Sequence, residues 1–123
     1  MPNKKILIAD DEPYILRSLS FVLKKEGFDI ETACNGEEAL EKAQQFKPKI
    51  LFLDVMMPKK DGYEVCNELK SNPDTKDIYI IILTAKGQII DKEKGLTTGA
   101  DEYITKPFSP REIVNKVKKI MES

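Results

Sequence analysis

The chain has 123 residues, 41% of them hydrophobic and 33% charged, which is the composition of one globular domain with a core of its own. Its 20 basic and 21 acidic residues leave a net charge of -1, without the basic excess of a nucleic-acid-binding surface. There is no histidine, and Cys34 and Cys66 form no C-x-x-C motif, which argues against zinc sites and histidine-based catalysis. No apolar run is long enough for a membrane span and no signal peptide begins the chain, so we expect a cytoplasmic protein without a membrane partner.

The first part of the chain alternates short apolar runs with amphipathic segments. KILIAD at 5–10 predicts a strand, and PYILRSLSFVLKKEG at 13–27 predicts a helix that ends at a glycine. Residues 28–34 alternate in the manner of a strand. Asn35 then caps a predicted helix over 36–46, whose first turn is acidic.

The middle of the chain continues this alternation. KILFLD at 49–54 is apolar at successive positions, which favours a parallel strand covered on both faces. A third helix is predicted over 61–73. The most hydrophobic run, at 78–84, predicts a fourth strand.

The last part predicts a helix, a strand and a helix. The segment 85–101 is interrupted by Gly95 and ends near Gly99, so it predicts the least stable helix, and 102–105 is a short fifth strand. The helix predicted over 109–121 has a strong start signal, with Ser109 as N-cap and Glu112 completing a capping box.

Five strands alternating with five helices predict an α/β fold. We expect a flavodoxin-like, doubly wound, five-stranded parallel sheet in the order 2-1-3-4-5, with helices on both faces. No linker or internal repeat divides the chain, so residues 1–123 are predicted to form one domain.

Polar residues follow the predicted strands at the edge where such sheets bind ligands. The carboxyl ends of the strands carry Asp10 and Asp11, Asp54, Thr84 and Lys106. Carboxylates held close together repel one another, and Mg²⁺ relieves this repulsion while leaving room for phosphate oxygens. Thr84 and Lys106 can bind the other oxygens of a phosphoryl group, so the set suits phosphoryl transfer.

Each of these residues also has an ordinary explanation. Asp10 or Asp11 alone can cap the following helix, and Asp54 alone can be a turn residue before Pro58. A threonine at the end of a strand reflects β-propensity, and a loop lysine is usually solvated. The combination at one sheet edge favours the functional interpretation.

Four segments in this order resemble the receiver domain of two-component response regulators. They are KKILIADDEP, LFLDVMMPKKDG, IIILTAKG and GADEYITKPFSP, and the resemblance covers essentially the whole chain. It implies that Asp54 accepts a phosphoryl group from the phosphohistidine of a histidine kinase. It further implies that Asp10 and Asp11 surround Mg²⁺, that Met56 adds its backbone carbonyl, and that Lys106 contacts the phosphoryl group.

The resemblance also implies a switch. Thr84 and Tyr103 match the pair that responds to phosphorylation, and the bond to Pro107 matches a cis peptide. Regulators of the winged-helix class dimerise through the surface formed by the fourth helix, fifth strand and fifth helix. The charge pairs expected there are Lys92 with Glu112 and Asp101 with Lys116.

The function implied is a phosphorylation-activated signalling switch that slowly dephosphorylates itself, not an enzyme that turns over a separate substrate. Its partners would be a sensor histidine kinase or phosphotransfer protein, a downstream effector, and a second copy after phosphorylation. No output domain is expected within 1–123, so no direct contact with nucleic acid is expected.

The sequence leaves three alternatives to this function open. A haloacid-dehalogenase-like phosphatase would carry D-x-D-x-T after its first strand, whereas this chain has DDEP there. A receiver-like binding module that works without phosphate would usually lack one of the key residues, and all are present. The chain can also be a fragment of a longer regulator.

Overall fold

The computed structural model describes residues 3–85 and 99–122. Its elements are, in chain order, β1 (Lys5–Ala9), α1 (Pro13–Lys25), β2 (Asp29–Ala33), α2 (Gly36–Phe46), β3 (Ile50–Asp54), α3 (Gly62–Lys70), β4 (Tyr79–Ala85), β5 (Glu102–Lys106) and α5 (Pro110–Met121).

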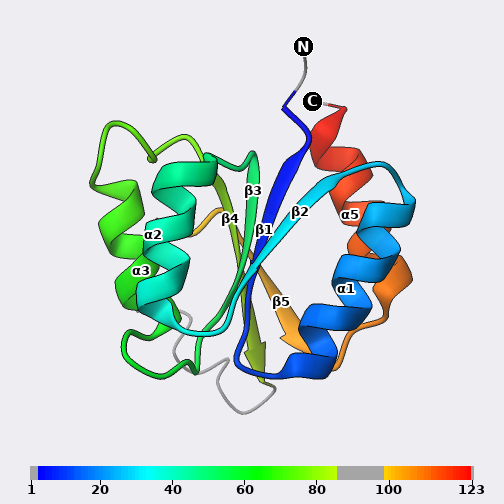
Figure 1. Cartoon of the computed structure of the whole chain (residues 1–123), viewed down its shortest axis with the longest axis horizontal. Coiled ribbons are helices and arrows are strands. Elements are labelled where there is room, and N and C mark those ends of the chain that lie inside the picture. The colour runs from blue at the N-terminus through cyan, green and yellow to red at the C-terminus, as the bar shows by residue number, and fades with distance from the viewer. Residues whose placement is uncertain (1–2, 86–98, 123) are drawn as a thin grey trace.

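The five strands form one parallel sheet in the order β2-β1-β3-β4-β5. Helices α1 and α5 cover one face and α2 and α3 the other, and all strands run toward the same edge (Figure 1). The predicted fold class and strand order are therefore confirmed.

The apolar sequence of the central strand β3 follows from its position in the sheet. Successive side chains of a strand point to opposite faces, and both faces are covered here. Leu51 and Leu53 pack in the core under α2 and α3, while Ile50 and Phe52 pack in the core under α1 and α5. All five residues of β3 are buried, and Asp54 is its last residue.

Local signals set the ends of the helices, as the sequence predicts. Helix α1 ends in a Schellman motif, with Gly27 at φ 95° and the Phe28 amide donating to the Leu23 carbonyl. Asn35 caps α2 by accepting a hydrogen bond from the Glu38 amide at 2.8 Å.

The helix predicted over 85–101 is not confirmed. Ala85 belongs to β4, and Gly99–Asp101 form a turn and a bend before β5. Residues 86–98 lie outside the described residues. The described residues thus contain four helices, where the sequence predicts five for the whole chain.

The start of α5 has the predicted capping box, in which the Ser109 hydroxyl accepts from the Glu112 amide at 3.2 Å and the Glu112 carboxylate accepts from the Ser109 amide. Ser109→Ala is expected to lower the free energy of unfolding by about 1 kcal/mol, because one amide at the helix start loses its acceptor. Urea denaturation measures this. Ser18→Ala in the middle of α1 is the control and should change stability little, since the exposed Ser18 donates a long hydrogen bond of 3.4 Å to the Ile15 carbonyl within the helix and caps no helix start. Equal losses in both variants would contradict the capping argument.

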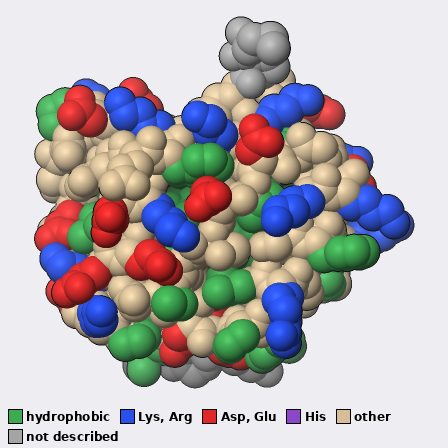
Figure 2. Space-filling view, in the orientation of Figure 1, with side chains coloured by type: hydrophobic (Ala, Val, Ile, Leu, Met, Phe, Trp, Pro, Cys, Tyr) green, Lys and Arg blue, Asp and Glu red, His purple; other side chains and the backbone are tan. Residues whose placement is uncertain are grey.

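The visible surface is mixed in charge. Figure 2 shows acidic and basic side chains interspersed on this face, in keeping with the net charge of -1. Among the described helices, none is long and apolar enough to cross a membrane.

Candidate functional site

Three strands bring the predicted site residues together at the carboxyl edge of the sheet. Lys106, which ends β5, places its Nζ 3.0 Å from Oδ2 of Asp10, just after β1, and 3.4 Å from Oδ1 of Asp54, which ends β3. The Asp10 and Asp54 side chains are 0% and 5% exposed, and that of Lys106 is 16% exposed. One ammonium group therefore contacts two buried carboxylates that lie far apart in the sequence and balances part of their charge.

Glu12 joins this group, and the sequence analysis assigned it no role. Its carboxylate accepts a hydrogen bond from Lys106 Nζ at 3.1 Å. Glu12 occupies the N-cap position of α1, but its side chain makes no capping hydrogen bond. A hydrogen bond with the Tyr14 side chain, followed by that from Lys106, lowers the pKa of Glu12. The position of Glu12 directly after Asp10 and Asp11 is the sequence signal that would have suggested a role for Glu12 at this site.

The surroundings of Asp54 disfavour its charge. Burial, followed by the negative charge of Asp10, raises the pKa of Asp54 to about 7, although Lys106 acts in the opposite direction. Burial also works against the charge of Lys106, but the neighbouring carboxylates of Asp10, Asp54 and Glu12 outweigh it and raise the pKa of Lys106 above its usual value. Without a metal, the site thus has more negative charge than its single lysine can balance.

The acidic residues after β1 can bind a cation. Carboxylate oxygens of Asp10, Asp11 and Glu12 all lie within 4.8 Å of one another. Oδ1 of Asp10 accepts from the Glu12 amide at 2.9 Å, whereas Oδ2 has no hydrogen bond among the described residues despite the nearby ammonium. Because this set consists of hard oxygen donors with surplus negative charge, the residues fit Mg²⁺.

Asp54 and Met56 adjoin this cluster. Asp54 is not one of the three clustered acids, but a hydrogen bond with the Asp11 side chain contributes to the rise in its pKa. The Met56 amide lies 3.4 Å from Oδ1 of Asp54, and the Met56 side chain is exposed.

Thr84 and Tyr103 both carry buried hydroxyls. Neither Oγ1 of Thr84 nor the phenol oxygen of Tyr103 has a hydrogen-bond partner within the described ranges. Thr84 pairs in register with Thr105, next to Lys106. Tyr103 packs against the core beneath α3, and burial, with smaller effects from Tyr63 and Cys66, raises its pKa to about 12. The peptide bond between Lys106 and Pro107 is cis.

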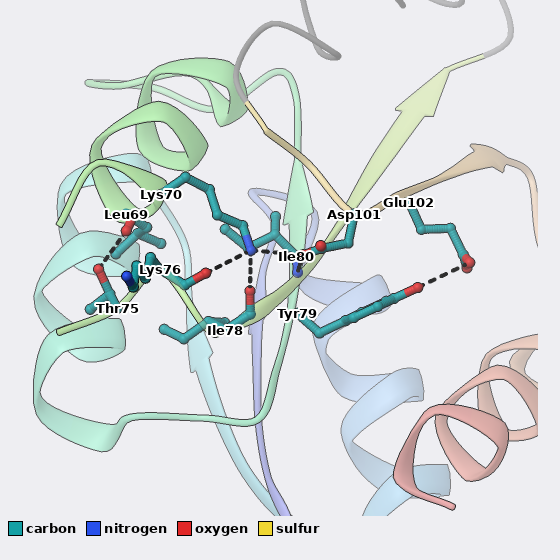
Figure 3. A network of polar contacts seen from close by, with 9 residues as sticks. All are labelled: Leu69, Lys70, Thr75, Lys76, Ile78, Tyr79, Ile80, Asp101 and Glu102. Carbon is teal, nitrogen blue, oxygen red and sulfur yellow. Dashed lines mark hydrogen bonds and ion pairs between the residues drawn. The ribbon is translucent and has the colours of Figure 1, made fainter. Parts of the chain in front are cut away.

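Three of the four residues expected at a dimer surface have partners within the chain. Asp101 accepts from Lys70 Nζ at 2.9 Å and from the Ile80 amide at 2.8 Å (Figure 3). Lys116 pairs with Glu102 at 2.8 Å. Glu112 belongs to the capping box of α5. Lys92 lies outside the described residues, so its pairing with Glu112, like that of Asp101 with Lys116 at a dimer surface, stays a prediction.

Comparison with known proteins decides the family. The family model for the response regulator receiver domain matches residues 6–118. The chain belongs to this family. The receiver domain is 51% identical over 120 residues to the alkaline phosphatase synthesis transcriptional regulatory protein PhoP of Bacillus subtilis, which covers 97% of this chain and 49% of the relative. It therefore spans about half the length of the curated relatives that it matches.

Solved structures are similar over the whole receiver domain. The chemotaxis response regulator CheY4 of Vibrio cholerae is 30% identical, with a TM-score of 0.88 and coverage of 96% of this chain and 98% of that one. The receiver domain of a sensor histidine kinase from Pseudomonas aeruginosa is 25% identical, with a TM-score of 0.88 and coverage of 98% and 99%. The latter is described with a magnesium ion coordinated in its active site cleft.

Proposed function

We propose that this receiver domain is a phosphorylation-activated switch in which Asp54 accepts a phosphoryl group from the phosphohistidine of a sensor histidine kinase or phosphotransfer protein. The observation that carries the proposal is the contact of Lys106 with both Asp54 and Asp10 at a buried sheet edge. A nucleophilic carboxylate, a nearby cation and an acidic cluster that fits Mg²⁺ are the groups that phosphoryl transfer requires.

The carboxylate of Asp54 acts as the nucleophile. One of its oxygens attacks phosphorus in line with the bond to the histidine nitrogen, and that bond breaks as the new oxygen–phosphorus bond forms. Lys106 binds a phosphoryl oxygen and balances its charge. Asp10, Asp11, Asp54 and the Met56 carbonyl would hold Mg²⁺, which supplies charge neutralisation when bound.

The switch residues respond to the new group. The Thr84 hydroxyl, which lacks a partner among the described residues, is suited to donate a hydrogen bond to a phosphoryl oxygen. We propose that Tyr103 then changes its packing and alters the surface of β5 and α5. That surface regulates a downstream effector, and homodimerisation through Lys92, Asp101, Glu112 and Lys116 accompanies phosphorylation.

The reaction remains within this chain. Asp54 is phosphorylated, and water slowly hydrolyses the resulting aspartyl phosphate to the free carboxylate and inorganic phosphate, so the domain does not turn over a separate substrate. We propose a cytoplasmic location and no contact of this domain with nucleic acid. The PhoP relative is a transcriptional regulatory protein about twice as long as the matched segment, so a DNA-binding effector within a longer regulator is compatible with this function.

Intact-mass spectrometry tests the proposal. Incubation with Mg²⁺ and acetyl phosphate is expected to add one phosphate to the native protein and none to Asp54→Ala, because the nucleophile is gone. Asp29→Ala is the matched control, since Asp29 is exposed at the start of β2, at the opposite edge of the sheet. It should be phosphorylated normally. A native protein that binds Mg²⁺ but stays unmodified would overturn the proposed function.

A further inference from the structure

Gly36, the buried first residue of α2, touches the backbone of a loop that starts at the candidate site. Residues 55–61, here called the acceptor loop, connect Asp54 to α3. A Cβ atom built on Gly36 would overlap the carbonyl oxygen of Lys60 and lie 2.7 Å from its carbonyl carbon. Because these are backbone atoms, no side-chain rotation can relieve the clash.

A hydrogen bond adds to this contact. The Gly36 amide donates to the carbonyl of Pro58 at 3.2 Å. This amide is one of the donors at a helix start that has no partner within the helix. The first turn of α2 is itself held by the Asn35 cap and by the Glu38 carboxylate, which accepts from the Cys34 amide at 2.6 Å. The acceptor loop therefore rests against a well-anchored helix end.

The other side of the acceptor loop is held as closely. The Gly62 amide donates to the Val55 carbonyl at 2.9 Å, and a Cβ atom on Gly62 would lie 2.5 Å from the Asp54 carbonyl oxygen. Two helix starts thus hold the loop by backbone contacts. Between them lie the residues that follow Asp54, including Met56.

We propose that Gly36 is a positioning residue for cation binding: its missing side chain lets α2 press the acceptor loop into the conformation in which the Met56 carbonyl and Asp54 bind Mg²⁺. This inference rests on the proposed function, since it assumes the same metal site. A methyl group at position 36 would displace the loop backbone, and ligand positions tolerate such displacements poorly.

The direct test is the Mg²⁺ dissociation constant, measured by isothermal titration calorimetry well below the melting temperature. Gly36→Ala is expected to weaken Mg²⁺ binding about tenfold. Gly27→Ala is the matched control, because Gly27 has φ 95° and open space around it, so an alanine there is strained without touching the loop. It should lose stability and keep the native Mg²⁺ affinity. Native affinity in a folded Gly36→Ala variant would overturn the inference.

Hydrogen exchange on the native protein gives a second test that needs no variant. Saturating Mg²⁺ is expected to slow exchange of the Gly36 amide, which donates to the loop, more than that of the Glu38 amide, which donates to the Asn35 cap. Equal slowing of both would overturn the inference. If the native protein neither binds Mg²⁺ nor accepts phosphate, the proposed function fails. If it does both and Gly36→Ala still binds Mg²⁺ normally, only the role of Gly36 is wrong.

Discussion

Lys106→Met is expected to lower the melting temperature by about 10 °C in Mg²⁺-free buffer at pH 8, which corresponds to roughly 3 kcal/mol. The reason is that Lys106 contacts Asp10, Asp54 and Glu12 at 3.0–3.4 Å, and two of these side chains are nearly inaccessible to water. Without the ammonium, Asp10 and Asp54 remain as buried, unpaired charges. Thermal denaturation followed by circular dichroism measures the loss.

Mg²⁺ should restore part of this stability. The ammonium and the metal compete for the same carboxylates, so saturating Mg²⁺ is expected to raise the melting temperature of Lys106→Met more than that of the native protein. Lys118→Met is the matched control, because Lys118 forms a 2.7 Å ion pair with Glu26 on the surface and its side chain is 53% exposed. Its stability should change little. Similar losses in the two variants would contradict the neutralising role of Lys106.

Asp54→Asn is expected to stabilise the Mg²⁺-free protein at pH 8 by on the order of 2 kcal/mol. This is about half of the roughly 4 kcal/mol that the pKa difference alone would give, because the substitution also removes the ion pair with Lys106. In the native state the pKa of Asp54 is raised to about 7 by burial and by Asp10. In the unfolded chain an aspartate ionises near pH 4. The native protein therefore loses stability as pH rises from about 4 to 7 and has lost the full amount above 7. Asparagine removes this cost.

The difference in melting temperature between Asp54→Asn and the native protein should be largest at pH 8 and shrink toward zero at pH 4. Melts across this range at constant ionic strength test it. Asp61→Asn is the control, since Asp61 is a partly exposed residue that caps α3 through the Glu64 amide and asparagine caps equally well. The melting temperature of Asp61→Asn should show no gain over the native protein that grows from pH 4 to pH 8. A gain for Asp54→Asn that is the same at every pH would contradict the argument.

The sheet and most helix ends were predictable because their causes are local in sequence. The apolar run before Asp54 indicates a strand covered on both faces, and Ser109 with Glu112 marks a helix start whatever the rest of the chain does. The convergence of Asp10, Asp54 and Lys106 was also predictable, since parallel strands end at a common edge.

The contacts that refine the site depend on tertiary structure. In sequence, Glu12 is an ordinary acidic residue at the start of a helix. Only the path of β5 brings Lys106 into contact with it. Asp101 appears as a free surface charge until the structure shows Lys70 and the Ile80 amide bound to it. In sequence, Gly36 resembles many glycines at the start of a helix, and only the packing of α2 against the acceptor loop reveals its contact with Lys60.

The position of Asp54 on β3 has a consequence for how a signal leaves the site. β3 is hydrogen-bonded to β1 on one side and to β4 on the other, and all five of its residues are buried. We expect such a strand to exchange its amide hydrogens mainly through unfolding of the whole domain and not through local opening. The strand that carries the proposed acceptor therefore serves as a fixed point. Any response to a phosphoryl group must come from side chains and loops around the strand end, where local rearrangement needs far less free energy than unfolding.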